Sequence, residues 1–259
     1  MPYADIPLPA RPRPPEIIAH RGASRDAFEN TMAAFSLAID QGADGIELDV
    51  HATRDGVVVV HHDPLALRRI AGRAESVRIA DVTAAELAAY RLPSGDPIPT
   101  LSDVLTLVGD RAAVYVEVKG TGIERLVAAV LEAHPAVRSA VHAFDHRIPV
   151  AVRRIRPTTP IGLLSASYPL DVRAALSGSG AAALWQHTEL IDEALVTAVH
   201  AAGMRLIAWT ENSAPHARLL AAWGVDALCT DEPGALRAAL TAAAAGAPPE
   251  HQPPARGQR

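Results

Sequence analysis

The sequence predicts an α/β protein built as a closed (β/α)8 barrel, a TIM barrel, with a small hairpin and helical insertion after the second strand. Two observations lead to this prediction. Short apolar segments alternate with segments of helical spacing along most of the chain, and they make eight strands once one hairpin strand is set aside. No glycine-rich dinucleotide turn follows the first strand, which argues against an open, doubly wound sheet.

The first strand–helix unit and the second strand are clearly marked. We expect a strand at residues 16–20 and a helix at 31–41, where apolar residues recur on one face. Gly42 is a stop signal for that helix, and a second apolar strand follows at 44–50. These segments would form the first part of the barrel wall.

A hairpin and an insertion follow the second strand. Asp55 and Gly56 form a strong turn signal before the β-branched segment 57–61, so we expect that segment to return as an antiparallel strand. Residues 63–98, approximately, then form a small insertion with a weak helix signal at 83–90. The chain would rejoin the barrel after this insertion.

The remaining chain alternates regularly between helix and strand signals. Helices are expected at 100–108, 123–133, 146–155, 171–176, 192–202, 214–222 and 233–245. Strands are expected at 113–118, 140–144, 160–164, 181–185, 204–209 and 227–230. A helix between successive strands is typical of a parallel sheet, because parallel strands need a long crossover connection.

The composition of the two ends suggests the domain boundaries. Residues 1–15 are rich in proline, and we expect them to form an irregular N-terminal arm. Residues 16–245 form a single barrel domain in this interpretation. Residues 246–259 contain four prolines, and we expect a disordered tail.

Charge and composition exclude several classes of function. The formal net charge is −5, which disfavours nucleic acid or an anionic membrane surface as a partner. No apolar run of about 18 residues suggests a membrane span, and residues 1–15 lack the apolar centre of a secretory signal. The single cysteine, Cys229, excludes an intramolecular disulfide. We therefore expect a cytoplasmic protein without stable membrane insertion, and the sequence makes no prediction of its oligomeric state.

Chemically active residues gather where the first strands end. His20 and Arg21 end the first strand, Glu47 and Asp49 lie two positions apart in the second, and His62 follows the hairpin strand. Strand side chains alternate faces, so the two carboxylates point the same way. They form either a solvated strand face or a site for a shared proton or a divalent cation. Two histidines, an arginine and a cation are a suitable set for phosphodiester chemistry.

Three motifs together resemble those of the glycerophosphodiester phosphodiesterase family, in its bacterial cytoplasmic type. The motifs are His20-Arg21, Glu47-x-Asp49 and His62-Asp63. The resemblance covers roughly residues 16–240. It implies metal-dependent hydrolysis of a small-molecule glycerophosphodiester to sn-glycerol 3-phosphate and an alcohol. It also implies that His20 and His62 are the acid/base pair and that the cofactor is one divalent cation, Mg²⁺ or Ca²⁺.

Glu117 and Lys119 share one face of the third barrel strand. From the residues alone they form either an ion pair or part of the site. The family has the same Glu-x-Lys motif, and the resemblance makes Glu117 the third metal ligand beside Glu47 and Asp49. It places Lys119, together with Arg21, on the phosphate, where an arginine can offer a planar fork of donors.

Other positions match the family's motifs less closely. Phe144 and Trp209, at the ends of the fourth and seventh barrel strands, are expected to bind substrate. Glu211 stands where the family's Trp-Thr-x-Asn motif has an apolar residue, and it either adds negative charge to the pocket or faces outward. Asn30 and His61 are expected to be mainly structural. Six further histidines have no motif context: His134, His142, His146, His200, His216 and His251.

Two other functions are compatible with the sequence. A phospholipase D-like lyase acting on lysophospholipid or sphingomyelin would share the histidines and carboxylates, but its toxin members carry signals and disulfides. A non-catalytic barrel that binds phosphodiesters is the second alternative. Against it, every catalytic position of the family is present in this chain.

Overall fold

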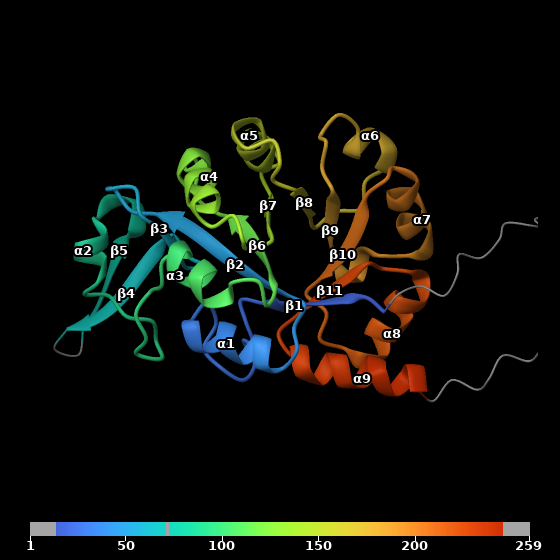
Figure 1. The fold of residues 1–259 in the computed structure, drawn as a ribbon, viewed down its shortest axis with the longest axis horizontal. Helices are drawn as coiled ribbons and strands as arrows, with labels where there is room; N and C mark the ends of the chain where they lie inside the picture. The colour runs from blue at the N-terminus through green and yellow to red at the C-terminus, as the bar shows by residue number, and fades with distance from the viewer. Residues whose placement is uncertain (1–13, 71–72, 246–259) are drawn as a thin grey trace, which may run out of the picture.

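The structure is a computed structural model that describes residues 14–70 and 73–245. The expected N-terminal arm lies outside the described residues except for Pro14 and Pro15, and the expected tail at 246–259 lies outside them entirely. The described part of the chain forms the ring of strands and helices seen in Figure 1.

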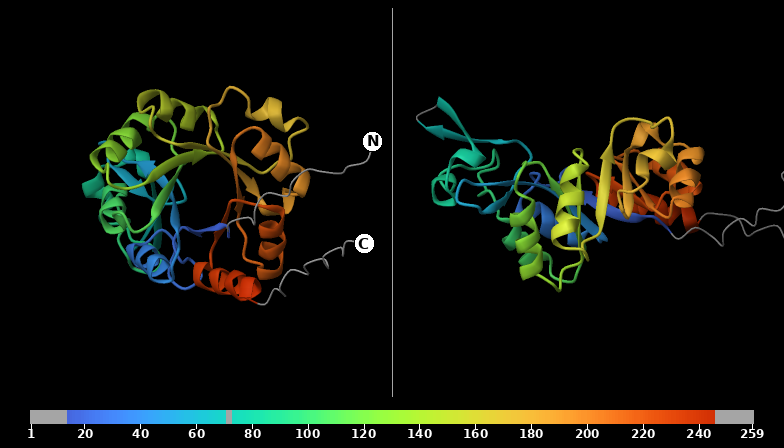
Figure 2. Two further views of the ribbon diagram at one scale, coloured as in Figure 1. Left: turned by 45° about the vertical axis from the view of Figure 1, so that its right-hand side comes forward. Right: turned by 90° about the horizontal axis from the view of Figure 1, so that it is seen from above.

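Within the described residues, eight parallel strands close into a barrel, which confirms the predicted fold (Figure 2). They follow one another around the ring in the order β1-β11-β10-β9-β8-β7-β6-β2, and the pairing of β1 with β2 closes it. The barrel strands are β1 (Glu16–His20), β2 (Gly45–Ala52), β6 (Ala113–Val118), β7 (Ser139–Ala143), β8 (Ile161–Ser165), β9 (Ala183–His187), β10 (Arg205–Trp209) and β11 (Ala227–Thr230). Because these strands run in one direction, their carboxyl ends meet at one rim.

Helices lie outside the ring, between successive strands (Figures 1 and 2). They are α1 (Met32–Asp40), α3 (Leu101–Val108), α4 (Glu124–Ala133), α5 (Arg147–Ile155), α6 (Val172–Leu176), α7 (Glu193–Ala201), α8 (Ala214–Trp223) and α9 (Pro233–Ala245). The side chains of Thr31, Thr100, Asp192 and Ser213 accept hydrogen bonds from first-turn backbone N–H groups. Short polar side chains are good N-caps because they satisfy these otherwise unpaired donors, so the sequence marks where these helices begin.

The insertion contains a hairpin that the sequence did not predict. β3 (Val58–Val60) returns antiparallel to β2, as expected, but β4 (Leu65–Ile70) and β5 (Arg73–Arg78) then form a second antiparallel pair. A 3-10 turn (Ile79–Asp81) and α2 (Ala84–Leu87) complete the insertion.

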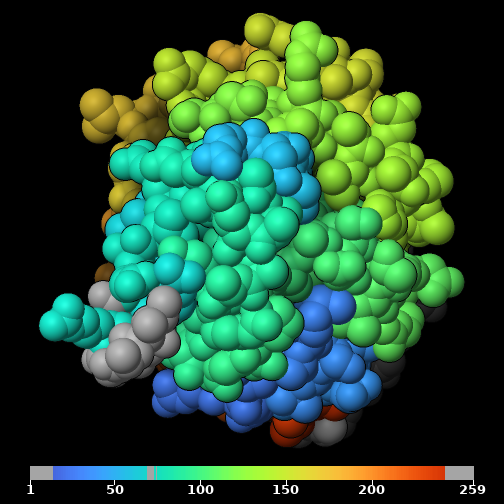
Figure 3. All heavy atoms as spheres, turned by 90° about the vertical axis from the view of Figure 1, so that its left-hand side faces the viewer, coloured from blue at the N-terminus to red at the C-terminus, as the bar shows by residue number. Residues whose placement is uncertain are grey.

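This hairpin is held by packing that local sequence signals do not reveal. Ala66 and Val77 pair across it and pack with Val59, Ile79 and Leu87 in a separate small core. The insertion, in teal, forms much of the face of the molecule seen in Figure 3.

The barrel interior is packed with apolar side chains at its middle. Ile18, Leu164, Trp185 and Ile207 form part of one buried cluster inside the ring. A Cβ atom added at Gly162 would lie 2.7 Å from the ring of Trp185, so a glycine gives this ring its room. Because the centre is filled, access for a ligand is at the ends of the barrel, and the polar site lies at the carboxyl rim.

Candidate active site

Strand pairing brings the predicted residues of three strands side by side. His20 of β1 lies in register with Glu47 of β2, and Asp49 of β2 with Glu117 of β6. Alternation along each strand then points Glu47, Asp49 and Glu117 toward the same interior. Glu47, Asp49 and Glu117 are 2%, 1% and 8% exposed, so the bland alternative of a solvated strand face is wrong.

His20 is held by a carboxylate from the last strand. Its Nδ1 lies 2.7 Å from Oδ1 of Asp231. Asp231 also accepts hydrogen bonds from Ser24 Oγ at 3.0 Å and from Asn212 Nδ2 at 2.6 Å. Burial opposes the charge on Asp231, but the bonds from His20, Asn212 and Ser24 outweigh it and lower its pKa to about 2. An ionised Asp231 favours the tautomer of His20 that carries its proton on Nδ1, which leaves Nε2 unprotonated.

Arg21 and Asn30 converge on Asp49. The Arg21 backbone N–H donates to Glu47 at 3.1 Å, and its side chain lies 2.9 Å from Glu29 and 3.1 Å from Asp49. Asn30 Nδ2 donates to Asp49 at 2.9 Å. Both Arg21 and Asn30 have φ near +56°, a conformation that costs non-glycine residues energy and often marks functional sites. Thr31 caps the first helix, and the Asn30 side chain instead contacts a carboxylate of the cluster.

The three carboxylates differ in their electrostatic surroundings. Burial, followed by nearby negative charge, raises the pKa of Glu47 well above its usual value and raises that of Glu117. Burial would also raise the pKa of Asp49, but Arg21 and Lys119 outweigh it and lower the pKa. The Lys119 ammonium lies 3.0 Å from Glu117 and 3.5 Å from Asp49. The site therefore contains excess negative charge that a cation or protons must balance.

His142 is a residue of this cluster that the sequence did not identify. Among the described residues, Glu47, Glu117 and His142 place ligand atoms within 4.8 Å of one another. The His142 ring is stacked on Trp185 at 4.1 Å, and burial lowers its pKa to about 3, so it is neutral at pH 7. The signal for it was its place inside the expected strand 140–144, which pairs with the strand of Glu117 and brings the two residues into register.

His62 lies beside the carboxylate network at the end of the hairpin strand. Its Nδ1 is 2.9 Å from Asp63, and its carbonyl contacts His51 Nε2 at 3.1 Å. Because β3 ends at Val60, His61 and His62 lie outside the strand and do not alternate between its two faces. Both histidines line the same small pocket, where His61 Nδ1 lies 2.8 Å from the carbonyl oxygen of Asp63.

The rings of Phe144 and Trp209 pack on each other near the carboxyl ends of β7 and β10. Their ring centroids are 5.4 Å apart in an edge-to-face arrangement, and the His187 ring also packs edge to face on Trp209, at 5.3 Å. Phe144 is 49% exposed. The pair offers an aromatic surface to a bound molecule.

Glu211 faces away from the ligand pocket. It is 2% exposed, accepts the Thr188 hydroxyl at 2.6 Å and the Ser213 backbone N–H at 2.7 Å, and pairs with His216 at 2.6 Å. Its charge is therefore satisfied between β9, β10 and α8.

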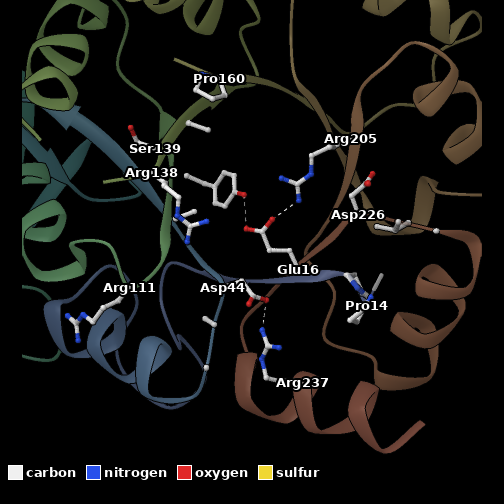
Figure 4. Close-up of a pocket in the computed structure, with 18 of the residues that line it drawn as sticks. Pro14, Glu16, Asp44, Arg111, Arg138, Ser139, Pro160, Arg205, Asp226 and Arg237 are labelled. Carbon is white, nitrogen blue, oxygen red and sulfur yellow. Dashed lines mark hydrogen bonds and ion pairs between the residues drawn. The ribbon is translucent and has the colours of Figure 1, made fainter. Parts of the chain in front are cut away.

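A larger cavity, of about 1220 Å³, lies at the opposite, amino end of the barrel (Figure 4). Glu16 accepts a hydrogen bond from Tyr115 at 2.8 Å and pairs with Arg205 at 2.5 Å, and Asp44 pairs with Arg237. The carboxylates of this cavity are thus paired with basic side chains, and Arg111 and Arg138 also line it. In barrels of this kind the functional residues lie at the other rim.

The fold and the site together define a (β/α)8-barrel enzyme. Residues 20–235 match the model of the glycerophosphoryl diester phosphodiesterase family, and the chain belongs to that family. It is 34% identical to YhdW of Bacillus subtilis (strain 168) over 233 residues, which are 84% of this chain and 94% of that protein. It is 33% identical over 234 residues to a glycerophosphodiester phosphodiesterase of Caldanaerobacter subterraneus subsp. tengcongensis, covering 85% and 95% of the two chains.

Solved structures have the same architecture. An Oleispira antarctica phosphodiesterase in complex with the product sn-glycerol-3-phosphate superposes with a TM-score of 0.78 at 26% identity, covering 88% of this chain and 97% of that one. A glycerophosphodiester phosphodiesterase from Thermotoga maritima has a TM-score of 0.72 at 28% identity, covering 86% and 97%. No helix within residues 14–70 and 73–245 is both long enough and apolar enough to cross a membrane.

Proposed function

We propose that the protein hydrolyses glycerophosphodiesters to sn-glycerol 3-phosphate and an alcohol with one divalent cation. The observation behind this proposal is the gathering of His20, Arg21, Asp49, Glu117 and Lys119 at one rim of the barrel. Membership of the family supports the reaction class. The Oleispira antarctica phosphodiesterase bound to sn-glycerol-3-phosphate supports the product.

The carboxylates fit a hard divalent cation, Mg²⁺ or Ca²⁺. The buried Oδ1 of Asp49 makes no hydrogen bond within the described residues, and the nearest cation, the Lys119 ammonium, is 3.5 Å away, so this oxygen has a lone pair for a ligand. We assign the ligands to Glu47, Asp49 and Glu117, because both cations prefer oxygen. His142 lies against the same two glutamates but offers nitrogen, so we give it a supporting role. A bound cation would supply positive charge to the phosphoryl oxygens.

Arg21 and Lys119 bind the phosphate in this proposal. Both side chains are partly buried and anchored by carboxylates, at 18% and 21% exposure, so each cation is held in place before substrate arrives. Preorganised positive charge stabilises the charge that develops on phosphoryl oxygens better than mobile charge does.

His20 and His62 move the protons. One histidine takes the proton of the attacking oxygen, and the other gives a proton to the alkoxide oxygen as its bond to phosphorus breaks. The glycerol hydroxyl next to the phosphate attacks first, giving a cyclic phosphate that water then opens. Asp231 fixes the tautomer of His20 throughout.

Phe144 and Trp209 bind the alcohol part of the substrate. The half-exposed ring of Phe144 and the partly buried ring of Trp209 lie on the same rim as the cation site. A cationic alcohol such as choline would be attracted to such faces.

The proposal is tested by release of glycerol 3-phosphate from glycerophosphocholine. We expect EDTA to abolish the release, Mg²⁺ or Ca²⁺ to restore it, and His20→Ala and His62→Ala each to remove it. His200→Ala is a matched control, because His200 also pairs with an aspartate, Asp226 at 2.9 Å, but at the amino end of the barrel. Full turnover by His20→Ala and His62→Ala would refute the acid/base assignment.

A further inference from the structure

His142 lies in one row with two of the proposed cation ligands. Strand pairing places Asp49 of β2 in register with Glu117 of β6, and Glu117 in register with His142 of β7. Residues in register on adjacent strands point to the same side of the sheet, and this row faces the barrel interior. Two carboxylates and one imidazole therefore converge from three adjacent strands.

The next position of this row is a glycine, which leaves room for an aromatic partner of the imidazole. His142 lies in register with Gly162 of β8, where an added Cβ atom would lie 3.2 Å from Cβ of His142 and 2.7 Å from the ring of Trp185. In that room the rings of His142 and Trp185 stack nearly parallel, at an interplanar angle of 7°. A stacked imidazole keeps its edge free, so its nitrogens stay open to a ligand in the plane of the ring.

The nitrogens of His142 are not bonded by the surrounding side chains. The residue is 1% exposed, and within residues 14–70 and 73–245 its Nδ1 has no hydrogen-bond partner. Its Nε2 lies 3.9 Å from Oε1 of Glu47, which is too long for a hydrogen bond. Buried polar groups are normally paired, because an unpaired one costs free energy. This buried, unpaired imidazole therefore indicates a ligand.

The separation of His142 from Glu47 suits two ligands of one metal ion. Bonds from such an ion to imidazole nitrogen or carboxylate oxygen are roughly 2.0–2.2 Å long, so two ligand atoms lie about 3–4 Å apart. Glu47, Glu117 and His142 offer ligand atoms within 4.8 Å of one another. Imidazole nitrogen suits transition cations such as Zn²⁺, whereas Mg²⁺ and Ca²⁺ are held by oxygen.

We propose that His142 is a further ligand at the cation site and makes it bind a transition-metal dication, of the class of Mn²⁺, Co²⁺ and Zn²⁺, more tightly than Mg²⁺ or Ca²⁺. The inference rests on the proposed function, whose cation site it extends by one nitrogen. Mg²⁺ or Ca²⁺ would use the oxygens of Glu47, Asp49 and Glu117, and His142 would keep its supporting role beside them. A transition cation would use the nitrogen as well.

Nitrogen coordination can be detected directly with Mn²⁺. We would strip the protein with EDTA, add one equivalent of Mn²⁺ and record electron spin echo envelope modulation, which detects a nitrogen nucleus bound to the ion. We expect ¹⁴N modulation in the wild type, replaced by the ¹⁵N pattern when the protein is labelled with ¹⁵N-histidine. This measurement needs no substitution, so it does not depend on whether a variant folds. Absence of nitrogen modulation from bound Mn²⁺ would overturn the inference.

Substitutions identify which histidine is bound. His142→Gln should remove the modulation, because an amide replaces the imidazole. His20→Gln should keep the modulation, because Nδ1 of His20 is held by Asp231. His51→Gln should keep it too, since His51 is also buried but its Nε2 lies 3.1 Å from the carbonyl oxygen of His62. Modulation that survives in His142→Gln would assign the nitrogen to another residue and would overturn the inference.

Metal affinity gives a second readout that is independent of activity. Isothermal titration calorimetry would give Kd for Co²⁺ and Mg²⁺ in the wild type and in His142→Gln. The ratio of the Mg²⁺ Kd to the Co²⁺ Kd should fall at least about tenfold in the variant, because even residues that only support a ligand contribute roughly 10–100-fold to metal affinity. His51→Gln should leave the ratio unchanged. An unchanged ratio in His142→Gln, shown by thermal unfolding to be folded, would contradict the ligand role.

The outcomes distinguish this inference from the proposed function. Release of glycerol 3-phosphate with Mg²⁺ or Ca²⁺, together with no nitrogen modulation from Mn²⁺, would overturn the role of His142 alone. Release that EDTA does not affect, together with no cation bound in calorimetry, would overturn both the role of His142 and the metal dependence of the proposed function.

Discussion

Asp231 holds His20 at 2.7 Å, although the two residues lie 211 positions apart in the chain. Parallel pairing of β1 with β11 brings them together, since Ala19 lies in register with Thr230. The contact favours the His20 tautomer with its proton on Nδ1.

Asp231→Asn should lower kcat more than it raises KM. An asparagine side chain cannot hold the imidazolium by charge and can favour the other tautomer, so we expect a loss of on the order of 10²-fold or more in kcat. Steady-state kinetics on glycerophosphocholine, with a pH–rate profile, measure the effect. An unchanged profile with normal kcat would contradict the positioning role. His200→Ala again serves as the control for a histidine–aspartate contact at the far end of the barrel.

Divalent cations should stabilise the folded protein, because the buried carboxylates repel one another without them. At a cation concentration of about 100 Kd, the expected gain is about 2.7 kcal/mol of unfolding free energy. Thermal unfolding with EDTA, Mg²⁺ and Ca²⁺ measures it. Glu117→Gln should reduce the gain, whereas Glu75→Gln, which removes an exposed partner of Arg68, should not. Equal midpoints with and without cation would argue against the metal site.

The Asp231 carboxylate should make the free energy of unfolding depend on pH under acidic conditions. Its folded-state pKa of about 2 lies below the ordinary value of 3.8, so the folded state favours the ionised form. The contribution is complete above about pH 4 and is lost as the pH falls through the folded pKa, near pH 2. Allowing for solvent around this partly exposed group, it amounts to about 1 kcal/mol. Urea unfolding should show wild type and Asp231→Asn converging as the pH falls over this range.

Glu211→Leu should affect stability more than substrate preference. The variant leaves the Thr188 hydroxyl and the His216 ring without their buried acceptor, which costs about 1–3 kcal/mol. Chemical unfolding measures the loss. KM for glycerophosphocholine should stay within about twofold, because the side chain points away from the pocket. A large change in KM with normal stability would place Glu211 in the substrate site instead.

Much of the barrel could be predicted because its signals are local. Capping residues such as Thr100 and Ser213 mark helix starts, and apolar runs mark strands buried on both faces. The alternation of side chains along a strand also predicted correctly that Glu47 and Asp49 point to the same side of the sheet. The β4–β5 hairpin was missed, because its strands are stabilised by packing on Val59 and Leu87 rather than by their own sequence pattern.

The sequence by itself determined the order of strands and helices, the family resemblance and the set of reactive side chains at the strand ends. Each of these depends on spacing over a few residues. Only the tertiary structure decided that Asp231 holds His20, that His142 joins Glu47 and Glu117, and that Leu65 and Leu67 lie beside His62. These contacts depend on closure of the barrel and on packing of the insertion, because both bring together residues that are distant in the chain and that no local pattern relates.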